Sequence, residues 1–151
     1  MIPRGGEVPR PFSCTPRGRR LRIEEGHGLQ RPCVDLVPQS CLDARLPRIT
    51  LQPIVENAIL HGIARKSEPR GTVFISAVRS GGKVVVTVRD DGAGIAPGRL
   101  REILAPGGRA AGYGVHSVRE RLHVLYGQEA ELRIESQEGS GTKVSLILPE
   151  P

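Results

Sequence analysis

The sequence has few aromatic residues and no long hydrophobic run. Phe, Trp and Tyr together make up 3% of the 151 residues, and Trp is absent. The core must therefore consist mainly of Val, Ile, Leu and Ala, and a nucleic-acid surface that stacks bases on aromatic rings is not expected. No apolar run approaches the roughly 18 residues of a membrane span, and no signal-peptide pattern is present. We expect a cytoplasmic chain with no nucleic-acid partner and no membrane contact.

Cysteine is also scarce, and its three copies all precede residue 42 (Cys14, Cys33 and Cys41). Their number is odd and their spacing matches no zinc pattern. Neither a disulfide framework nor a structural zinc site is therefore expected, and a reducing compartment is indicated.

Charge and proline are distributed unevenly along the chain. Residues 1–48 hold nine Arg against five acidic residues and seven of the thirteen prolines, whereas residues 49–151 are nearly balanced in charge. A segment as rich in Arg and Pro as the N-terminal one cannot bury enough apolar surface to order its backbone. We expect residues 1–41 to be a basic, Pro/Gly-rich segment that is largely disordered or irregular, and residues 42–151 to form the folded domain.

Hydrophobic periodicity predicts the elements of this domain. ITLQPIVENAILHGI has helical spacing, with Thr50 as a cap and Gly62 as a terminator. GTVFISAV and KVVVTVRD alternate around RSGG, which is typical of a hairpin. A short helix around LREIL, a helix over GVHSVRERLHVLY with Leu125 on its apolar face and Gly127 as its stop, and the strands AELRIES and TKVSLILP follow. This order predicts an α+β fold, a two-layer sandwich with a mostly antiparallel mixed sheet covered on one face by helices.

Two islands of polar residues interrupt this apolar pattern. Glu56 and Asn57 lie on the first helix with His61 one turn later. An Asn amide oxygen can bind Mg²⁺, although such a group can equally be a solvated helix face. In DDGAGI, Asp90 ends a strand and can accept a hydrogen bond from an exocyclic amine while glycines admit a flat ring, although Asp-Gly can also be a plain turn.

Two glycine-rich islands follow. Gly112-Tyr113-Gly114-Val115 opens a helix, where exposed N–H groups and the helix dipole favour phosphate, although a lone GxG is more often a loop. Gly139-Ser140-Gly141-Thr142 enters the last strand and can equally be a hairpin turn. Considered together, the four islands predict a purine nucleotide site. They would supply a cation-binding helix, an amine acceptor, a phosphate-binding helix start and a closing Gly-Thr.

LQPIVENAILHG, DDGAGI, GYGVHSVRERL and GSGTKVSLILP resemble the N, G1, G2 and G3 boxes of the GHKL ATPases. This superfamily includes sensor histidine kinases, DNA gyrase, Hsp90 and MutL. The sequence is most similar to the catalytic ATP-binding domain of LytS/YesM-type sensor histidine kinases, over roughly residues 42–149. The resemblance implies the Bergerat fold, with ATP and Mg²⁺ as ligands.

The resemblance also implies a role for each matching residue. Glu56 and His61 would lie beside the triphosphate as catalytic residues, and Asn57 would be the metal ligand. Asp90 would accept from the adenine amine with support from Thr142, and residues 96–111 would form the lid over the nucleotide. Asp91 is expected to be a solvated neighbour. The full set of implied nucleotide contacts is Asn57, Asp90, Gly92, Gly94, Ile95, Arg109, Gly112, Gly114, Val115 and Thr142.

Two features bear on the reaction. Hydrolytic members of the superfamily resemble one another in a Glu four residues before the metal Asn, where this chain has Pro53, so efficient hydrolysis is not expected. The phosphoacceptor stretch of the family has no match around His27, His61, His116 or His123. We therefore expect γ-phosphoryl transfer to a histidine on a dimerisation helix outside this chain, with a response regulator downstream. An anti-sigma-factor-like serine kinase and a non-catalytic nucleotide-binding regulator remain alternatives.

Overall fold

The computed structural model describes residues 51–106 and 113–150, with the side chain of Tyr113 excluded. The predictions for Thr50, Arg109, Gly112 and the segment 1–41 lie outside these residues. The helices are α1 (Leu51–Asn57), the π-helix η2 (Ala58–Gly62), the 3-10 helix η3 (Ile63–Arg65), α2 (Pro97–Leu104) and α3 (Tyr113–Tyr126). The strands are β1 (Val73–Ser80), β2 (Lys83–Asp90), β3 (Glu131–Gln137) and β4 (Gly141–Pro149).

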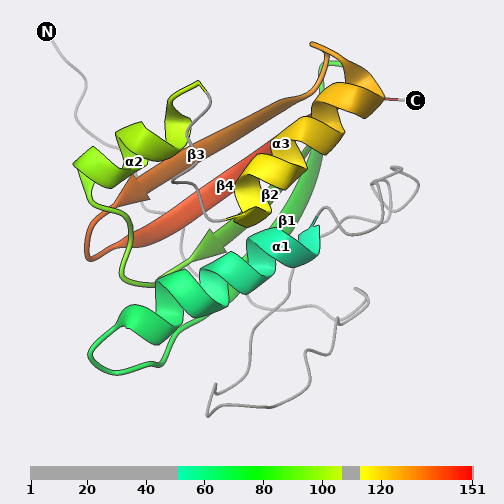
Figure 1. The fold of residues 1–151 in the computed structure, drawn as a ribbon. Coiled ribbons are helices and arrows are strands. Elements are labelled where there is room, and N and C mark those ends of the chain that lie inside the picture. Colours follow the sequence, from blue (N-terminus) through cyan, green and yellow to red (C-terminus); the bar gives the residue numbers. More distant parts are fainter. Residues whose placement is uncertain (1–50, 107–112, 151) are drawn as a thin grey trace, which may run out of the picture.

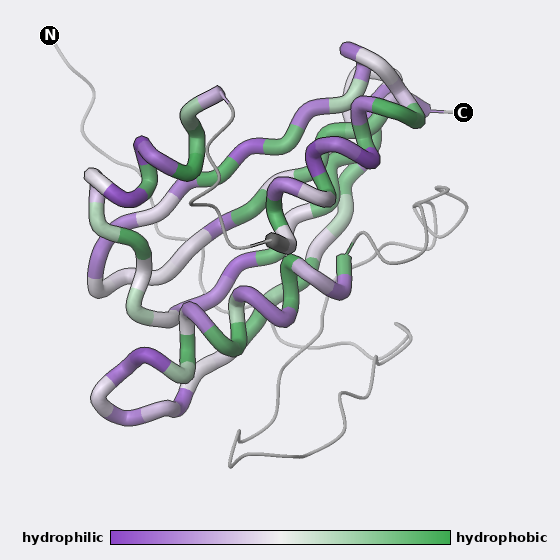
Figure 2. The backbone as a smooth tube through the Cα atoms, in the orientation of Figure 1, coloured by the Kyte–Doolittle hydropathy of each residue, from purple (hydrophilic) through white to green (hydrophobic). Residues whose placement is uncertain are grey.

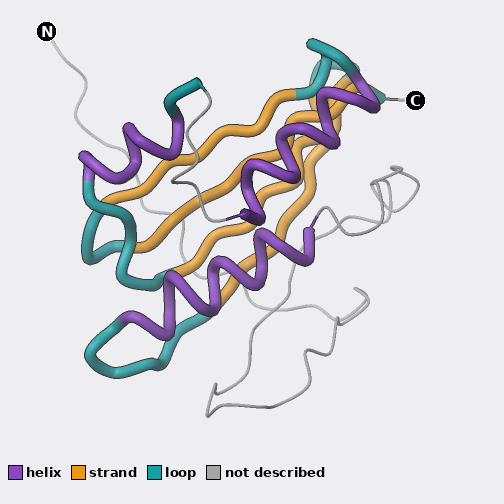
Figure 3. The backbone as a smooth tube through the Cα atoms, in the orientation of Figure 1, coloured by secondary structure: helices purple, strands orange, loops and turns teal. Residues whose placement is uncertain are grey.

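The four strands form one sheet in the order β1-β2-β4-β3, and the helices lie on one face of it (Figures 1 and 3). Every pairing between these described strands is antiparallel. The predicted α+β two-layer architecture is confirmed. Within the described residues, no helix is long and apolar enough to cross a membrane.

The core lies between the sheet and the helices. Burial alternates along most of β1, β2 and β3, as expected for strands with one face against the helical layer, and Figure 2 shows where the hydrophobic residues lie along each strand. The side chains that are almost fully buried are Ile54, Ile63, Val73, Val84, Val88, Val118 and Leu146. They are all aliphatic, as the scarcity of aromatics predicted.

The turn between β1 and β2 shows why RSGG contains two glycines. Gly81 and Gly82 have φ angles of 60° and 71°. Both central residues of a type I′ hairpin turn need positive φ, which only glycine adopts without cost. The predicted hairpin is confirmed, with Ser80 paired to Lys83.

Two details of the predicted helices are wrong. The first helix does not stop at Gly62, because η2 and η3 continue it to Arg65. Gly62 has a φ of −91° and is buried, so it is not a terminator. Its close contact with the Asp90 side chain explains the glycine instead. Leu125 does not face the core: 56% of it is exposed, whereas Val118 and Leu122 are buried as expected. Gly127 does end α3, where its N–H donates to the His123 carbonyl at 2.8 Å.

Candidate functional site

A row of polar side chains crosses one end of the sheet. Asp90 on β2 pairs with Thr142 on β4, and Thr142 pairs with Ser136 on β3. Paired residues in an antiparallel sheet project from the same face. Alternation along each strand places all three on the helix-covered face, in line with the core residues Val88, Val144 and Ile134. We call Asp90, Thr142 and Ser136 the polar row.

Asp90 is the buried member of the polar row, with 4% of its surface exposed. Its Oδ1 accepts a hydrogen bond from the Gly92 N–H at 2.8 Å. Burial raises the pKa of the Asp90 carboxyl, because the charged form is desolvated, while N–H donation from the Gly92 and Thr142 backbones opposes that rise. A carboxylate has lone pairs for several hydrogen bonds, so a buried one is suited to recognising a donor on a ligand.

Two glycines pack directly around the Asp90 carboxylate. A Cβ added to Gly62 would lie 2.6 Å from Asp90 Oδ1, and a Cβ on Gly92 would lie at the same distance from that atom. The Cβ added to Gly92 would also collide with the Gly62 backbone. The carbonyl of Gly62 accepts from the Ala93 N–H at 2.9 Å, which ties the DDGAGI loop to the end of η2. Glycine at both positions lets the loop, the helix and the carboxylate pack together.

The second half of the DDGAGI loop lies against β3 and the β3–β4 turn. Gly94 has a φ of 69°, and a Cβ there would collide with the Gln137 carbonyl. The Ala93 carbonyl accepts from the Gly139 N–H at 2.7 Å. The sequence predicts that Gly92 and Gly94 clear space for a flat ring. In the structure both glycines are explained by close backbone contacts, and their lining of a base remains a prediction.

Ser136 connects this loop to the polar row. Its Oγ lies 2.9 Å from the Ile95 nitrogen, 2.9 Å from the Gly141 carbonyl oxygen and 2.8 Å from Thr142 Oγ1. The sequence interpretation did not identify Ser136 as a site residue. The signal that could have identified it is the alternation in AELRIES, which places Ser136 on the same face as Leu132 and Ile134.

Asn57 lies beside the start of α3. A Cβ on Gly114 would be 2.9 Å from Asn57 Nδ2 and 3.1 Å from Pro53 Cβ. The half-buried Asn57 thus meets the N-terminus of a 14-residue helix, where free N–H groups and the helix dipole favour anions. The structure therefore brings together the predicted metal ligand and the predicted phosphate-binding glycine, 57 residues apart in the sequence.

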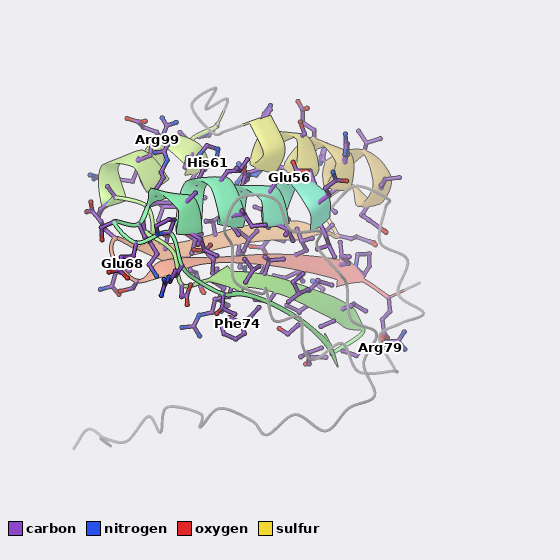
Figure 4. All side chains as sticks on the ribbon, turned by 90° about the horizontal axis from the view of Figure 1, so that it is seen from below. Glu56, His61, Glu68, Phe74, Arg79 and Arg99 are labelled. Carbon is purple, nitrogen blue, oxygen red and sulfur yellow. The ribbon has the colours of Figure 1, made fainter. Side chains whose placement is uncertain are left out.

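Glu56 and His61 lie on the helical layer, whereas Phe74 lies on the opposite side of the sheet (Figure 4). The side chains of Glu56 and His61 are exposed. Glu56 Oε1 accepts from Gln52 Nε2 at 2.8 Å, one turn earlier on α1. Their predicted catalytic roles stay predictions. Val115 is partly buried against the core, next to Gly114.

Asp91 has a structural contact that the sequence interpretation missed. Its Oδ1 accepts from the Thr72 N–H at 2.7 Å, and the Asp91 N–H donates to the Thr72 carbonyl at 3.3 Å. These bonds join the end of β2 to the residue before β1. Asp91 is exposed, as expected, but it closes the outer edge of the sheet beside the polar row.

The donor set limits the kind of cation that this face of the domain suits. Among the described residues, no group of three or more His, Cys, Asp or Glu side chains could hold a metal ion. Asn57, whose amide nitrogen Nδ2 is the atom nearest to a Gly114 Cβ at the helix start, would offer one hard amide oxygen. This fits Mg²⁺, which keeps several waters and takes phosphate oxygens when only one or two protein ligands are present.

Comparison with known proteins gives a consistent result. Residues 42–151 match the family model described as "Histidine kinase-, DNA gyrase B-, and HSP90-like ATPase". The chain is 36% identical over 131 residues to sensor histidine kinase YesM of Bacillus subtilis, and 34% identical over 130 residues to sensor histidine kinase BtsS of Escherichia coli K12. These matches cover 87% and 85% of the chain but only 21% of each relative, so the chain spans about a fifth of their length. The YesM match must begin upstream of residue 42, further toward the N-terminus than the motifs indicated.

A solved structure of similar fold is the nucleotide-free catalytic domain of histidine kinase ThkA. It superposes with a TM-score of 0.53 at 23% identity, and the match covers 67% of this chain and 64% of that one. At this level of identity the likeness supports the fold alone.

Proposed function

The chain belongs to the family of histidine kinase-, DNA gyrase B- and HSP90-like ATPases, and we propose that residues 42–151 are the ATP-binding catalytic domain of a sensor histidine kinase. The observation that carries this proposal is the buried Asp90 carboxylate, which Gly62 and Gly92 enclose and Thr142 adjoins. A buried acceptor at a strand end, beside glycine-rich backbone, suits the exocyclic amine of adenine. The relatives named above are sensor histidine kinases, which favours this branch of the family.

The residues present divide the binding of ATP among three elements. Asp90 accepts from the adenine amine, with Thr142 beside it. The free N–H groups at the start of α3, around Gly114, receive phosphate oxygens. Asn57 offers its amide oxygen to Mg²⁺, which when bound would neutralise charge on the phosphates. Gly92, Gly94, Ile95 and Val115 position the backbone between these points.

The reaction that we propose is transfer of the γ-phosphoryl group to a histidine outside this chain. An imidazole nitrogen attacks the γ-phosphorus, the bond to the β–γ bridging oxygen breaks, and ADP leaves. A neutral imidazole is already nucleophilic near pH 7, so positioning and charge stabilisation contribute most of the catalysis. Glu56 and His61 are exposed on the helical stretch that carries Asn57, and we propose them as the candidates for orienting these groups. A response regulator would then receive the phosphoryl group.

Pro53 favours a kinase over a hydrolase. It occupies the position of the water-activating Glu of hydrolytic family members, and proline has no side-chain base. Its Cβ lies 3.1 Å from the position of a Gly114 Cβ, so it serves as a packing contact between α1 and α3. We therefore propose that ATP is consumed slowly unless a histidine acceptor is supplied.

Calorimetric titration of Mg-ATP into the chain tests the site. We expect the parent to bind, Asp90→Asn to abolish binding, and Asn57→Ala to weaken binding mainly when Mg²⁺ is present. A folded parent that shows no binding at millimolar ATP would refute the proposal.

The acceptor is tested separately with radiolabelled ATP and the dimerisation segment of a sensor histidine kinase relative, expressed on its own. Acid-labile phosphate on the histidine of that segment supports the kinase assignment. Phosphoserine on a partner would instead favour a serine kinase, and binding without any transfer would favour a nucleotide-binding regulator.

A further inference from the structure

The hydrogen bonds around Ser136 determine where the hydroxyl proton of Thr142 must lie. The Ile95 N–H can only donate to Ser136 Oγ, and the Gly141 carbonyl can only accept from it, both at 2.9 Å. Because Ser136 has one hydroxyl proton, that proton is used by Gly141. The 2.8 Å contact between Ser136 and Thr142 is then a hydrogen bond only if Thr142 donates.

This assignment makes Thr142 an acceptor toward the rest of the site. With its proton directed to Ser136, Thr142 Oγ1 presents only lone pairs to a ligand or a bridging water. Asp90, its register partner, presents carboxylate oxygens. Two neighbouring members of the polar row therefore offer acceptors and no side-chain donor.

We propose that Ser136 is a positioning residue for base selectivity: by taking the Thr142 hydroxyl proton, it tunes the site to 6-amino purines and against 6-oxo purines. This inference rests on the proposed ATP site. A 6-amino group donates to both acceptors, whereas a 6-oxo group sets its oxygen against them. An unpaired or repelled polar group in a partly dry site costs more than a missing contact.

Ser136 also positions the loop that carries Gly94. Its acceptance of the Ile95 N–H joins β3 to the DDGAGI loop across 41 residues of sequence. Loss of the hydroxyl will therefore weaken the binding of every purine nucleotide somewhat. Selectivity, measured as the ratio of affinities for ATP and ITP, separates base recognition from this general effect. ITP has a 6-oxo group and an N1–H where ATP has a 6-amino group and an unprotonated N1, and it has no 2-amino group, so it differs from ATP only at the N1/C6 edge of the ring.

The test compares Mg-ATP and Mg-ITP titrations for the full chain and five variants. Ser136→Ala removes the acceptor of the Thr142 proton and lets that hydroxyl turn and donate to a 6-oxo group. Ser136→Thr keeps a hydroxyl at the same place. Ser145→Ala is the matched control, because Ser145 also contacts a threonine hydroxyl, that of Thr87 at 3.5 Å, but on the other face of the sheet. Circular dichroism and urea midpoints establish that each variant is folded.

We expect the ATP-to-ITP affinity ratio to fall roughly three- to tenfold in Ser136→Ala, the scale of one hydrogen bond. Ser136→Thr and Ser145→Ala should keep the parent ratio. In a Thr142→Val background, Ser136→Ala should change the ratio no further, and this comparison remains informative if the single variant is unstable.

The outcomes distinguish this inference from the proposed function. If the parent binds neither nucleotide, the ATP site itself is refuted and the inference falls with it. If the parent prefers ATP but Ser136→Ala weakens both nucleotides equally, or changes neither, Ser136 is only structural and the inference alone is overturned.

Discussion

Replacing Gly62 by alanine is a sharp test of the geometry around Asp90, because two effects act in opposite directions. Gly62 lies in a helical segment at a φ of −91°, where alanine is allowed. Helix propensity alone predicts that Gly62→Ala stabilises the fold by about 1 kcal/mol. The structure predicts the opposite sign, because the new Cβ would lie 2.6 Å from the buried Asp90 Oδ1.

The magnitude follows from what Asp90 would lose. Real Cβ contacts essentially never fall below 3.0 Å, so the carboxylate must move away from Gly62. Moving it breaks its 2.8 Å hydrogen bond from the Gly92 N–H, which costs about 1.5–3 kcal/mol for a charged group. Overpacking costs about 1–3 kcal/mol, and the two costs overlap because both describe one displacement. After the propensity gain, we expect a net destabilisation of about 1–2 kcal/mol.

Urea unfolding measures this directly. With an unchanged slope, the midpoint should fall by roughly 1 M, and Mg-ATP affinity should fall because the displaced carboxylate no longer meets the base. Gly98→Ala is the matched control: Gly98 lies in α2, and its Cβ would have no neighbour within 4 Å. That variant should be neutral or up to about 1 kcal/mol more stable. A Gly62→Ala protein as stable as the parent, with normal ATP affinity, would show that this reasoning about Asp90 is wrong.

Three further expectations concern the same site. Burial raises the folded-state pKa of Asp90, so the free energy of unfolding of the parent, relative to that of Asp90→Asn, should be highest at acid pH and fall as pH rises from about 4 through that pKa. Urea unfolding of both proteins from about pH 3.5 to 8 measures this difference, and a flat or rising difference contradicts the expectation. Gly114→Ala should lower the urea midpoint slightly, since its Cβ would lie 2.9 Å from Asn57 Nδ2 and 3.1 Å from Pro53 Cβ, and should weaken Mg-dependent ATP binding in calorimetry; unchanged binding separates Asn57 from the site. Asp91→Ala should cost about 1 kcal/mol by loss of the Thr72 bond while Asp91→Asn costs less, and a large loss of ATP affinity in either would give Asp91 a binding role.

Local pattern in the sequence determined the elements and their order. Alternating apolar residues identified β1 to β4, because burying one face of a strand requires a period of two. The Gly81-Gly82 turn was predictable because the backbone angles of a two-residue hairpin require glycine. The four motifs also indicated the family, and they lie on the element types expected for them.

Prediction failed where a side chain's role depends on partners distant in the sequence. Leu125 has helical spacing with Val118 and Leu122, but it lies outside the buried stripe of α3 and is exposed. Gly62 followed an apolar run and was interpreted as a stop, yet its function is to approach Asp90. Spacing alone cannot distinguish a terminator from a close contact.

The family motifs already linked Asp90 with Thr142, but only the tertiary structure placed Ser136 beside them in the polar row. Asp90, Thr142 and Ser136 become neighbours only through the strand order β1-β2-β4-β3 and its register. The sequence places an acid, a threonine and a serine at strand ends, and each residue type is ordinary there. Their hydrogen-bond directions follow from contacts across 41 residues between Ile95 and Ser136, which no local pattern encodes.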